Sequence, residues 1–252
     1  MIRVLSGVVL AAAALAAIFF LPPLGLRILV CVIAALAAHE YLRLVGSNDS
    51  QIGGVVIFTW LVSTGSVVTL AMVPAVVVLF AGLNALYTKF SSPVAVLGAF
   101  AIAYISVPLG LLAALHIQRG WRATVLLIAT VVVSDSLQFY TGRIFGRRPL
   151  APSISPKKTV EGAIGGALAG TIFMVLAGPF VLPTTPPAML ALLGLTMVLL
   201  GIAGDLFESR LKREADVKDS SSLIPGHGGV LDRIDALLFV IPAFALAVGV
   251  WK

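Results

Sequence analysis

Long apolar runs separated by short polar breaks fill almost all of the 252-residue chain. A helix needs about 20 mostly apolar residues to cross the hydrocarbon core of a membrane. Membrane β-barrels instead show short strands of alternating polarity. The pattern predicts an all-α, polytopic integral membrane protein of about nine transmembrane helices: Val4–Leu21, Leu24–Tyr41, Ile52–Leu70, Val73–Thr88, Val94–Leu115, Trp121–Tyr140, Val160–Val181, Pro187–Leu206 and Arg233–Trp251.

The break between the first two apolar runs is clearly marked in the sequence, whereas the break between the third and fourth is not. Pro22 and Pro23 separate the first two runs, because proline cannot continue a helix and restricts the residue before it. The divide near Met72–Pro74 holds almost no polar residue, so eight helices is the alternative count. The N-terminal run is expected to be a membrane helix, since no signal-peptide cleavage site followed by a polar region comes after it.

Bulk composition agrees with a membrane protein. Hydrophobic residues make up 60% of the chain, charged residues 11%, and the mean hydropathy is +1.09. One core cannot bury that much apolar surface, which excludes a soluble enzyme, and the same numbers exclude a disordered chain and a disulfide scaffold. The single cysteine, Cys31, is expected to be buried. The net charge of +6 is interpreted as membrane topology, with no nucleic-acid partner.

The charges are distributed unevenly between the two faces of the predicted bundle. With nine spans, 13 of the 17 lysines and arginines fall on the side of the N-terminus, which is therefore predicted to be cytoplasmic. All 11 acids fall on or nearest that same face. Because acids contribute little to topology, this second asymmetry indicates a cytoplasmic site built from acids and bases.

Two polar loops, residues 134–166 and 204–235, carry most of the candidate chemistry. A charge at the centre of a membrane helix costs about 2.5–3.5 kcal/mol, so carboxylates inside or at the mouths of apolar runs need a reason. A shared hard cation such as Mg²⁺, which selects oxygen ligands, is one reason, and salt bridges to nearby bases are the other. Four aspartates occupy such places: Asp135, Asp205, Asp232 and Asp235.

Bases and glycines accompany these acids. Lys157 and Lys158 lie in the first loop, and a glycine-rich turn around His227 comes directly before the last helix. Glycine lets backbone N–H groups approach an anion, and a helix N-terminus favours negative charge. The combination predicts a site for a metal–polyphosphate complex. His227 could donate to a phosphate or fix the loop, whereas His39-Glu40 is expected to anchor a helix at the membrane interface.

Three sequence motifs carry a family resemblance. Ser209–Asp235 contains S-x-x-K-R-x4-K-D followed by P-G-H-G-G-x-x-D-R-x-D, and it resembles the signature of phosphatidate cytidylyltransferases, or CDP-diacylglycerol synthases. Ser155–Gly162 (S-P-K-K-T-x-E-G) and Ser134–Gly146 (S-D-x4-Y-x-G-R-x-F-G) are similar to further segments of that family. Gln138 departs from the alanine found in many members. The N-terminal half matches only in being apolar.

The resemblance implies an activity. It predicts a homodimeric enzyme of a bacterial-type inner membrane. The enzyme is expected to join CTP and phosphatidic acid on the cytoplasmic face, giving CDP-diacylglycerol and pyrophosphate. Mg²⁺ is the implied cofactor, and a second cation is left open. Residues 1–115 are expected to form a scaffold facing lipid or the dimer partner, and residues 116–252 the catalytic half. A CTP-dependent lipid-alcohol kinase and an ion transporter are the alternatives.

The same resemblance, together with the local chemistry, assigns roles to individual residues. The predicted catalytic residues are Lys218, Asp219, His227, Arg233 and Asp235. The predicted metal ligands are Asp205, Asp232 and Asp235, with Asp135 as a further candidate. The predicted substrate-binding residues are Ser155, Lys157, Lys158, Thr159, Lys212, Arg213, Gly226, Gly228 and Gly229.

Overall fold

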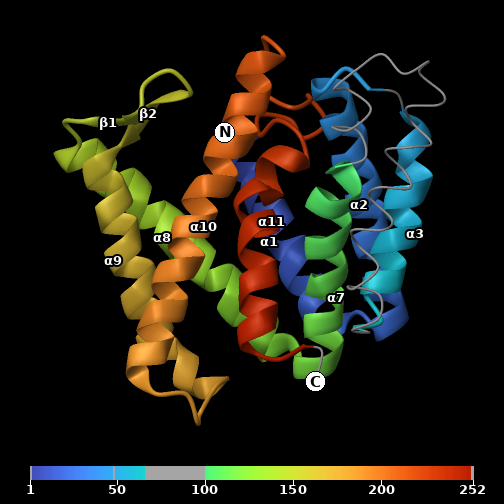
Figure 1. Cartoon of the computed structure of the whole chain (residues 1–252), viewed down its shortest axis with the longest axis horizontal. Coiled ribbons are helices and arrows are strands. Elements are labelled where there is room, and N and C mark those ends of the chain that lie inside the picture. Colours follow the sequence, from blue (N-terminus) through green and yellow to red (C-terminus); the bar gives the residue numbers. More distant parts are fainter. Residues whose placement is uncertain (1, 48, 66–99, 251–252) are drawn as a thin grey trace.

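Long helices and one small β-hairpin make up the protein, as described by a computed structural model for residues 2–47, 49–65 and 100–250 (Figure 1). Five of the described helices are long and apolar enough to cross a membrane. The chain is therefore a helical integral membrane protein, as the apolar runs predict. In chain order the elements are α1 (Ile2–Phe20), α2 (Pro23–Leu44), η1 (Asp49–Gln51), α3 (Ile52–Val62), η2 (Ile102–Ser106), α7 (Val107–Arg119), α8 (Trp121–Phe145), β1 (Pro149–Ala151), β2 (Ser155–Thr159), α9 (Val160–Ala177), η3 (Gly178–Phe180), α10 (Pro187–Glu214) and α11 (Leu231–Ala247).

The predicted helix starts agree better with the structure than the predicted ends. Helices α8, α9 and α10 begin at the predicted residues, but α10 continues to Glu214 instead of stopping at Leu206. Hydropathy marks where a helix stops being apolar, whereas the backbone hydrogen bonds of α10 continue for two further polar turns. The predicted span Val73–Thr88 lies outside the described residues, as do parts of the third, fifth and ninth spans.

The β-hairpin is the one departure from an all-α chain within the described residues. Strands β1 and β2 are antiparallel, with Pro149 opposite Thr159 and Ala151 opposite Ser155. The carboxylate of Glu161 accepts hydrogen bonds from the backbone N–H groups of Arg147 and Arg148, at 3.0 and 3.2 Å. Apolar periodicity cannot reveal such a short polar hairpin, because tertiary ties to the first turn of α9 hold it.

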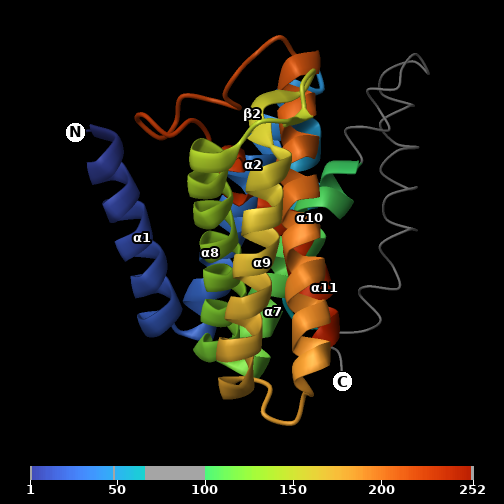
Figure 2. The same ribbon diagram turned by 90° about the vertical axis from the view of Figure 1, so that its left-hand side faces the viewer.

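Small residues let α8, α9 and α10 pack closely side by side (Figure 2). Gly162, Gly166 and Gly170 follow one another at four-residue spacing on α9, and all three are buried. A Cβ at Gly166 would lie 2.9 Å from the carbonyl oxygen of Ser134 on α8. Membrane helices commonly associate through such stripes of small residues. This packing fixes the position of α8 relative to α10, and both helices carry predicted site residues.

Aromatic side chains fill the interior on the other side of α10. The ring of Tyr104, from η2, lies 5.2 Å from Phe207 of α10 and 5.5 Å from Tyr41 of α2, measured between centroids. Phe239 of α11 lies 5.7 Å from Phe207. Since Phe239 is one turn beyond Asp235, this cluster ties the start of α11 to α2 and α10.

The polar connections gather at one end of the bundle. The hairpin, the α10–α11 connection and the α2–α3 turn lie at the upper end in Figure 1, and α1 begins near that end in Figure 2. The short connections after α1, α7 and α9 lie at the opposite end. The predicted site residues thus belong to one face of the bundle.

Candidate active site

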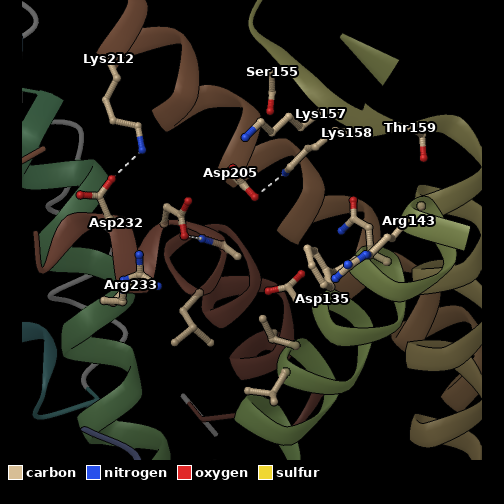
Figure 3. Close-up of a pocket in the computed structure, with 18 of the residues that line it drawn as sticks. Asp135, Arg143, Ser155, Lys157, Lys158, Thr159, Asp205, Lys212, Asp232 and Arg233 are labelled. Carbon is tan, nitrogen blue, oxygen red and sulfur yellow. Dashed lines mark hydrogen bonds and ion pairs between the residues drawn. The ribbon is translucent and has the colours of Figure 1, made fainter. Parts of the chain in front are cut away.

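A cavity of about 760 Å³ opens where the end of α8, the hairpin, α10 and the start of α11 converge. Figure 3 shows side chains from these four segments directed toward one another, with the hairpin lysines facing carboxylates of α8 and α10. The cavity is lined by five acids and five bases. They are Asp135, Asp205, Asp219, Asp232 and Asp235, with Arg143, Lys157, Lys158, Lys212 and Arg233.

One wall of this cavity is apolar. Its apolar lining comes from Ile128, Val131 and Val132 of α8 and from Leu237 of α11. Val132 is 55% exposed and Phe139, another lining residue, is 60% exposed, so part of this wall faces the surroundings of the helices. The cavity can therefore accept a molecule that has both a highly charged part and a hydrocarbon part.

Lysines already pair with several of the carboxylates. Lys158 of β2 forms an ion pair with Asp205 of α10. The Lys212 ammonium lies 2.6 Å from Asp232 Oδ1 and 2.5 Å from Glu208 Oε2, and the Glu208 side chain is fully buried. The alternative explanation for the aspartates, salt bridging to nearby bases, is thus realised for Asp205 and Asp232.

Asp232 is the most heavily engaged carboxylate of the site. Its Oδ2 accepts hydrogen bonds from Ser220 N–H (2.9 Å), Ser220 Oγ (2.8 Å) and Gly229 N–H (2.7 Å). Gly228 has a φ of +81°, and a Cβ there would lie 2.6 Å from Asp232 Oδ2. Two of the loop glycines therefore let the backbone close around this carboxylate.

The predicted metal ligands have the donor atoms that Mg²⁺ prefers, but they are not grouped around one point in the structure. Among the described residues, no three His, Cys, Asp or Glu side chains are grouped closely enough to hold a metal ion in this geometry. Asp135, Asp205 and Asp235 nevertheless line one cavity with oxygen-only donors, the type that Mg²⁺ prefers.

The glycine-rich turn borders a second, smaller cavity of about 460 Å³. Lys218, His227 and two loop glycines line it, and it shares Asp219 and Arg233 with the larger cavity. His227 Nδ1 lies 2.8 Å from Ser6 Oγ of α1. This contact favours the interpretation in which His227 fixes the loop. Of the remaining predicted residues, Arg213 donates to the Ile154 carbonyl at the tip of the hairpin, 3.4 Å away.

The structure brings to this region three residues to which the sequence analysis assigned no role at the site. Arg143 lines the larger cavity, and Ser220 binds Asp232. Glu40, expected at the membrane interface, is instead buried and accepts hydrogen bonds from the α10–α11 connection. Glu40 could have been found from the sequence, because it is a carboxylate at the end of an apolar run, as the candidate aspartates are.

Comparison with known proteins identifies the family. The chain matches the cytidylyltransferase family over residues 1–251. It is 31% identical over 277 residues to phosphatidate cytidylyltransferase from Haemophilus influenzae, covering 96% of both chains. It is 47% identical to the Bacillus subtilis enzyme of that name over 47% of this chain and 45% of the relative, and 44% identical to the Aquifex aeolicus one over 45% and 42%. In those two relatives the aligned part spans less than half of their length. The chain belongs to the cytidylyltransferase family.

Proposed function

We propose that the protein transfers the cytidylyl group of CTP to phosphatidic acid, giving CDP-diacylglycerol and pyrophosphate for phospholipid biosynthesis. The observation that carries the proposal is a single cavity with a polar half of five acids and five bases and an apolar wall from α8 and α11. The polar half suits a nucleoside triphosphate and a phosphate headgroup, and the apolar wall suits acyl chains. Bacterial relatives of that name, one of them aligned over 96% of the chain, support it.

The chemistry requires little activation of the nucleophile. A phosphate monoester with a second pKa of about 6 is largely a dianion at neutral pH. A lipid phosphate oxygen attacks the α-phosphorus of CTP, a new P–O bond forms, and the bond to the β-phosphate breaks as pyrophosphate leaves. The main obstacle is repulsion between two anions, which bases and in-line positioning reduce.

The charged residues divide between two sides of the cavity. On the hairpin side, Lys157 and Lys158 neutralise phosphate oxygens, with Ser155 and Thr159 as hydrogen-bonding neighbours. On the α11 side, Lys212 and Arg233 take the same role, and Lys218 reaches from the adjoining smaller cavity. The apolar wall lets phosphatidic acid enter sideways from the cytoplasmic leaflet, so that its acyl chains stay in the bilayer.

Mg²⁺ is proposed as the cofactor. Asp205, Asp232 and Asp235 would hold it, with Asp135 as a further candidate in the same cavity. When bound, the ion neutralises charge on the phosphate oxygens of CTP. Isothermal titration of Mg²⁺ into purified protein, with CTP present, is expected to give saturable binding that the Asp205→Asn variant weakens. Equal binding by that variant would contradict this ligand assignment.

We propose nine spans, a cytoplasmic N-terminus and a bacterial inner-membrane location. Helix α1 begins near the hairpin end of the bundle and α11 finishes at the other end (Figure 2), which supports an odd number of crossings. In a Cys31→Ala background, Ser153→Cys in the hairpin turn is expected to react with an impermeant thiol reagent only from the cytoplasmic side. Thr184→Cys is expected to react only from the other side, and the reverse pattern would refute the orientation.

The family resemblance also leads us to propose a homodimer that associates through the N-terminal helices. Several apolar side chains of α1 are exposed, including Phe20 at 83% and Val8 at 61%. Light scattering of the purified protein, corrected for bound detergent, is expected to give twice the chain mass of 26.2 kDa. A single-chain mass would contradict this proposal.

The decisive experiment is an assay of purified protein with CTP and phosphatidic acid, with and without Mg²⁺. The proposal requires pyrophosphate release and CDP-diacylglycerol formation in equal amounts. A CTP-dependent lipid-alcohol kinase would instead release CDP with diacylglycerol as acceptor, and a transporter would consume no CTP. Either result would overturn the proposed function.

A further inference from the structure

Glu40, in the last turns of α2, is a buried carboxylate in the half of the chain that carries none of the predicted site residues. Only 3% of the residue is exposed. It accepts four hydrogen bonds from the α10–α11 connection and the start of α11: from Ser220 Oγ (2.8 Å), Ser221 Oγ (2.7 Å), Val230 N–H (3.0 Å) and Leu231 N–H (2.8 Å). None of the ion pairs among the described residues includes Glu40.

Two of these bonds place the carboxylate at the N-terminus of α11. Val230 and Leu231 are the N-cap and the first residue of that helix, whose first N–H groups have no partner within the helix. A carboxylate there satisfies those donors and interacts favourably with the helix dipole. Here α2 supplies the capping group for α11. The helix turn that it fixes carries Asp232, Arg233 and Asp235, which all line the larger cavity.

Ser220 connects Glu40 directly to Asp232. Its Oγ lies 2.8 Å from Glu40 Oε2 and 2.8 Å from Asp232 Oδ2, while its N–H donates to Asp232. One hydroxyl hydrogen can serve only one of the two carboxylates at a time. A Cβ at Gly229 would collide with both Ser220 Oγ and Glu40 Oε2. Glu40, Ser220, Gly229 and Asp232 therefore form one closely packed unit, which we name the α2 anchor.

We propose that Glu40 is a positioning residue for the transfer reaction: it fixes the start of α11, and through Ser220 it orients the Asp232 carboxylate that lines the cavity. Glu40 lines neither cavity, so it acts through the groups that it holds. This inference rests on the transferase activity proposed above. Loss of the anchor should let the first turn of α11 and the loop move while the hairpin lysines stay in place.

Glu40→Gln is the sharpest variant, because it keeps the shape and removes the charge. The amide has one acceptor oxygen and places an NH₂ donor among groups that all donate. We expect kcat to fall roughly 10- to 100-fold, as for small displacements of reacting groups, with KM for CTP changed less than about threefold. Amide hydrogen exchange should rise in peptides covering residues 219–231 and not in α8 or α9.

Glu214→Gln is the matched control. Glu214 is an exposed glutamate at the end of α10 whose partner is Arg210 on the same helix. We expect its kcat and exchange pattern to equal those of the unmodified protein, since exposed pairs of this kind contribute little. Unchanged kcat in Glu40→Gln, or a fall in kcat accompanied by faster exchange throughout the bundle, would overturn the positioning role.

Ser221→Ala keeps the inference testable if Glu40→Gln does not fold. It removes one of the four donors and leaves the carboxylate in place. We expect kcat to fall about two- to fivefold, the size of one weakened hydrogen bond, with faster exchange confined to residues 219–231. Unchanged activity and exchange would contradict the proposal. Absence of transferase activity in the unmodified protein would refute the proposed function, while the exchange measurement would still test the α2 anchor.

Discussion

The two sides of the cavity are built in opposite ways. On the hairpin side, Lys157 and Lys158 lie on the short strand β2. Among the described residues, Lys158 forms an ion pair with Asp205 and Lys157 forms none. On the α11 side, Asp232 and Glu40 lie within hydrogen-bond distance of backbone and serine donors in seven contacts, three to Asp232 and four to Glu40. The hairpin therefore directs its lysines into the cavity, whereas the glycine-rich connection uses its N–H groups to hold carboxylates.

Removing the charge of Asp232 should give the largest effect. Asp232→Asn breaks the pairing with Lys212 and places an amide among the donors Ser220 and Gly229. We expect kcat/KM to fall by about 10³-fold or more, since buried charge and transition-state electrostatics are lost together. The loss of activity is measured by cytidylyl transfer with purified protein, and the loss of stability by thermal melting in detergent. Activity close to that of the unmodified protein would show that the α11 side does not matter for chemistry.

Removing a hairpin lysine should separate binding from stability. Lys158→Gln is expected to lower kcat/KM by about 10- to 100-fold, because one neutralising charge beside the phosphates is lost. Its melting temperature should stay within about 2 °C, since Asp205, the partner left behind, is 38% exposed and can be hydrated when the lysine charge is removed. Arg210→Gln, at an exposed site on α10, is the control. A large loss of stability in Lys158→Gln would erase the contrast between the two sides.

Adding a methyl group to the glycine-rich loop should lower stability more than activity, the opposite of the lysine variant. Gly229→Ala forces its Cβ against Ser220 and Glu40, so we expect a loss of about 1–3 kcal/mol in stability and a smaller loss of activity, about tenfold. Gly53→Ala, in α3, is the matched control, because a Cβ there meets nothing within 4 Å. Thermal melting of both variants tests this. Equal melting temperatures would mean that the loop is not closely packed around the carboxylates.

The contact of α1 with the glycine-rich turn should matter least. Ser6→Ala removes the hydroxyl that lies 2.8 Å from His227 Nδ1. We expect less than about a threefold change in kcat/KM, because a partly exposed hydrogen bond contributes at the low end of the usual range of about 0.5–1.5 kcal/mol. Steady-state kinetics with CTP as the varied substrate measures it. A much larger loss would assign His227 a part in the reaction beyond fixing the loop.

The sequence predicted the membrane class, the starts of the later helices and most of the cavity. Charged side chains next to apolar runs are costly, so Asp135, Asp205 and Asp235 could be found without coordinates. The hairpin could not, because polar segments of its kind carry no periodicity. Nor could the length of α10 beyond Leu206, which brings Lys212 over the cavity. Glu40 was visible as a charge but not as part of the site, since its partners lie 180 or more residues away in sequence.

The α2 anchor also has a consequence for how the protein is made. All four hydrogen bonds to Glu40 come from residues 220, 221, 230 and 231, at least 180 residues further along the chain. A ribosome makes α2 before those residues, so Glu40 cannot acquire these donors until the start of α11 has been synthesised. Formation of the α2 anchor therefore has to follow the synthesis of that segment, and a nascent chain that stops before residue 220 lacks all four donors.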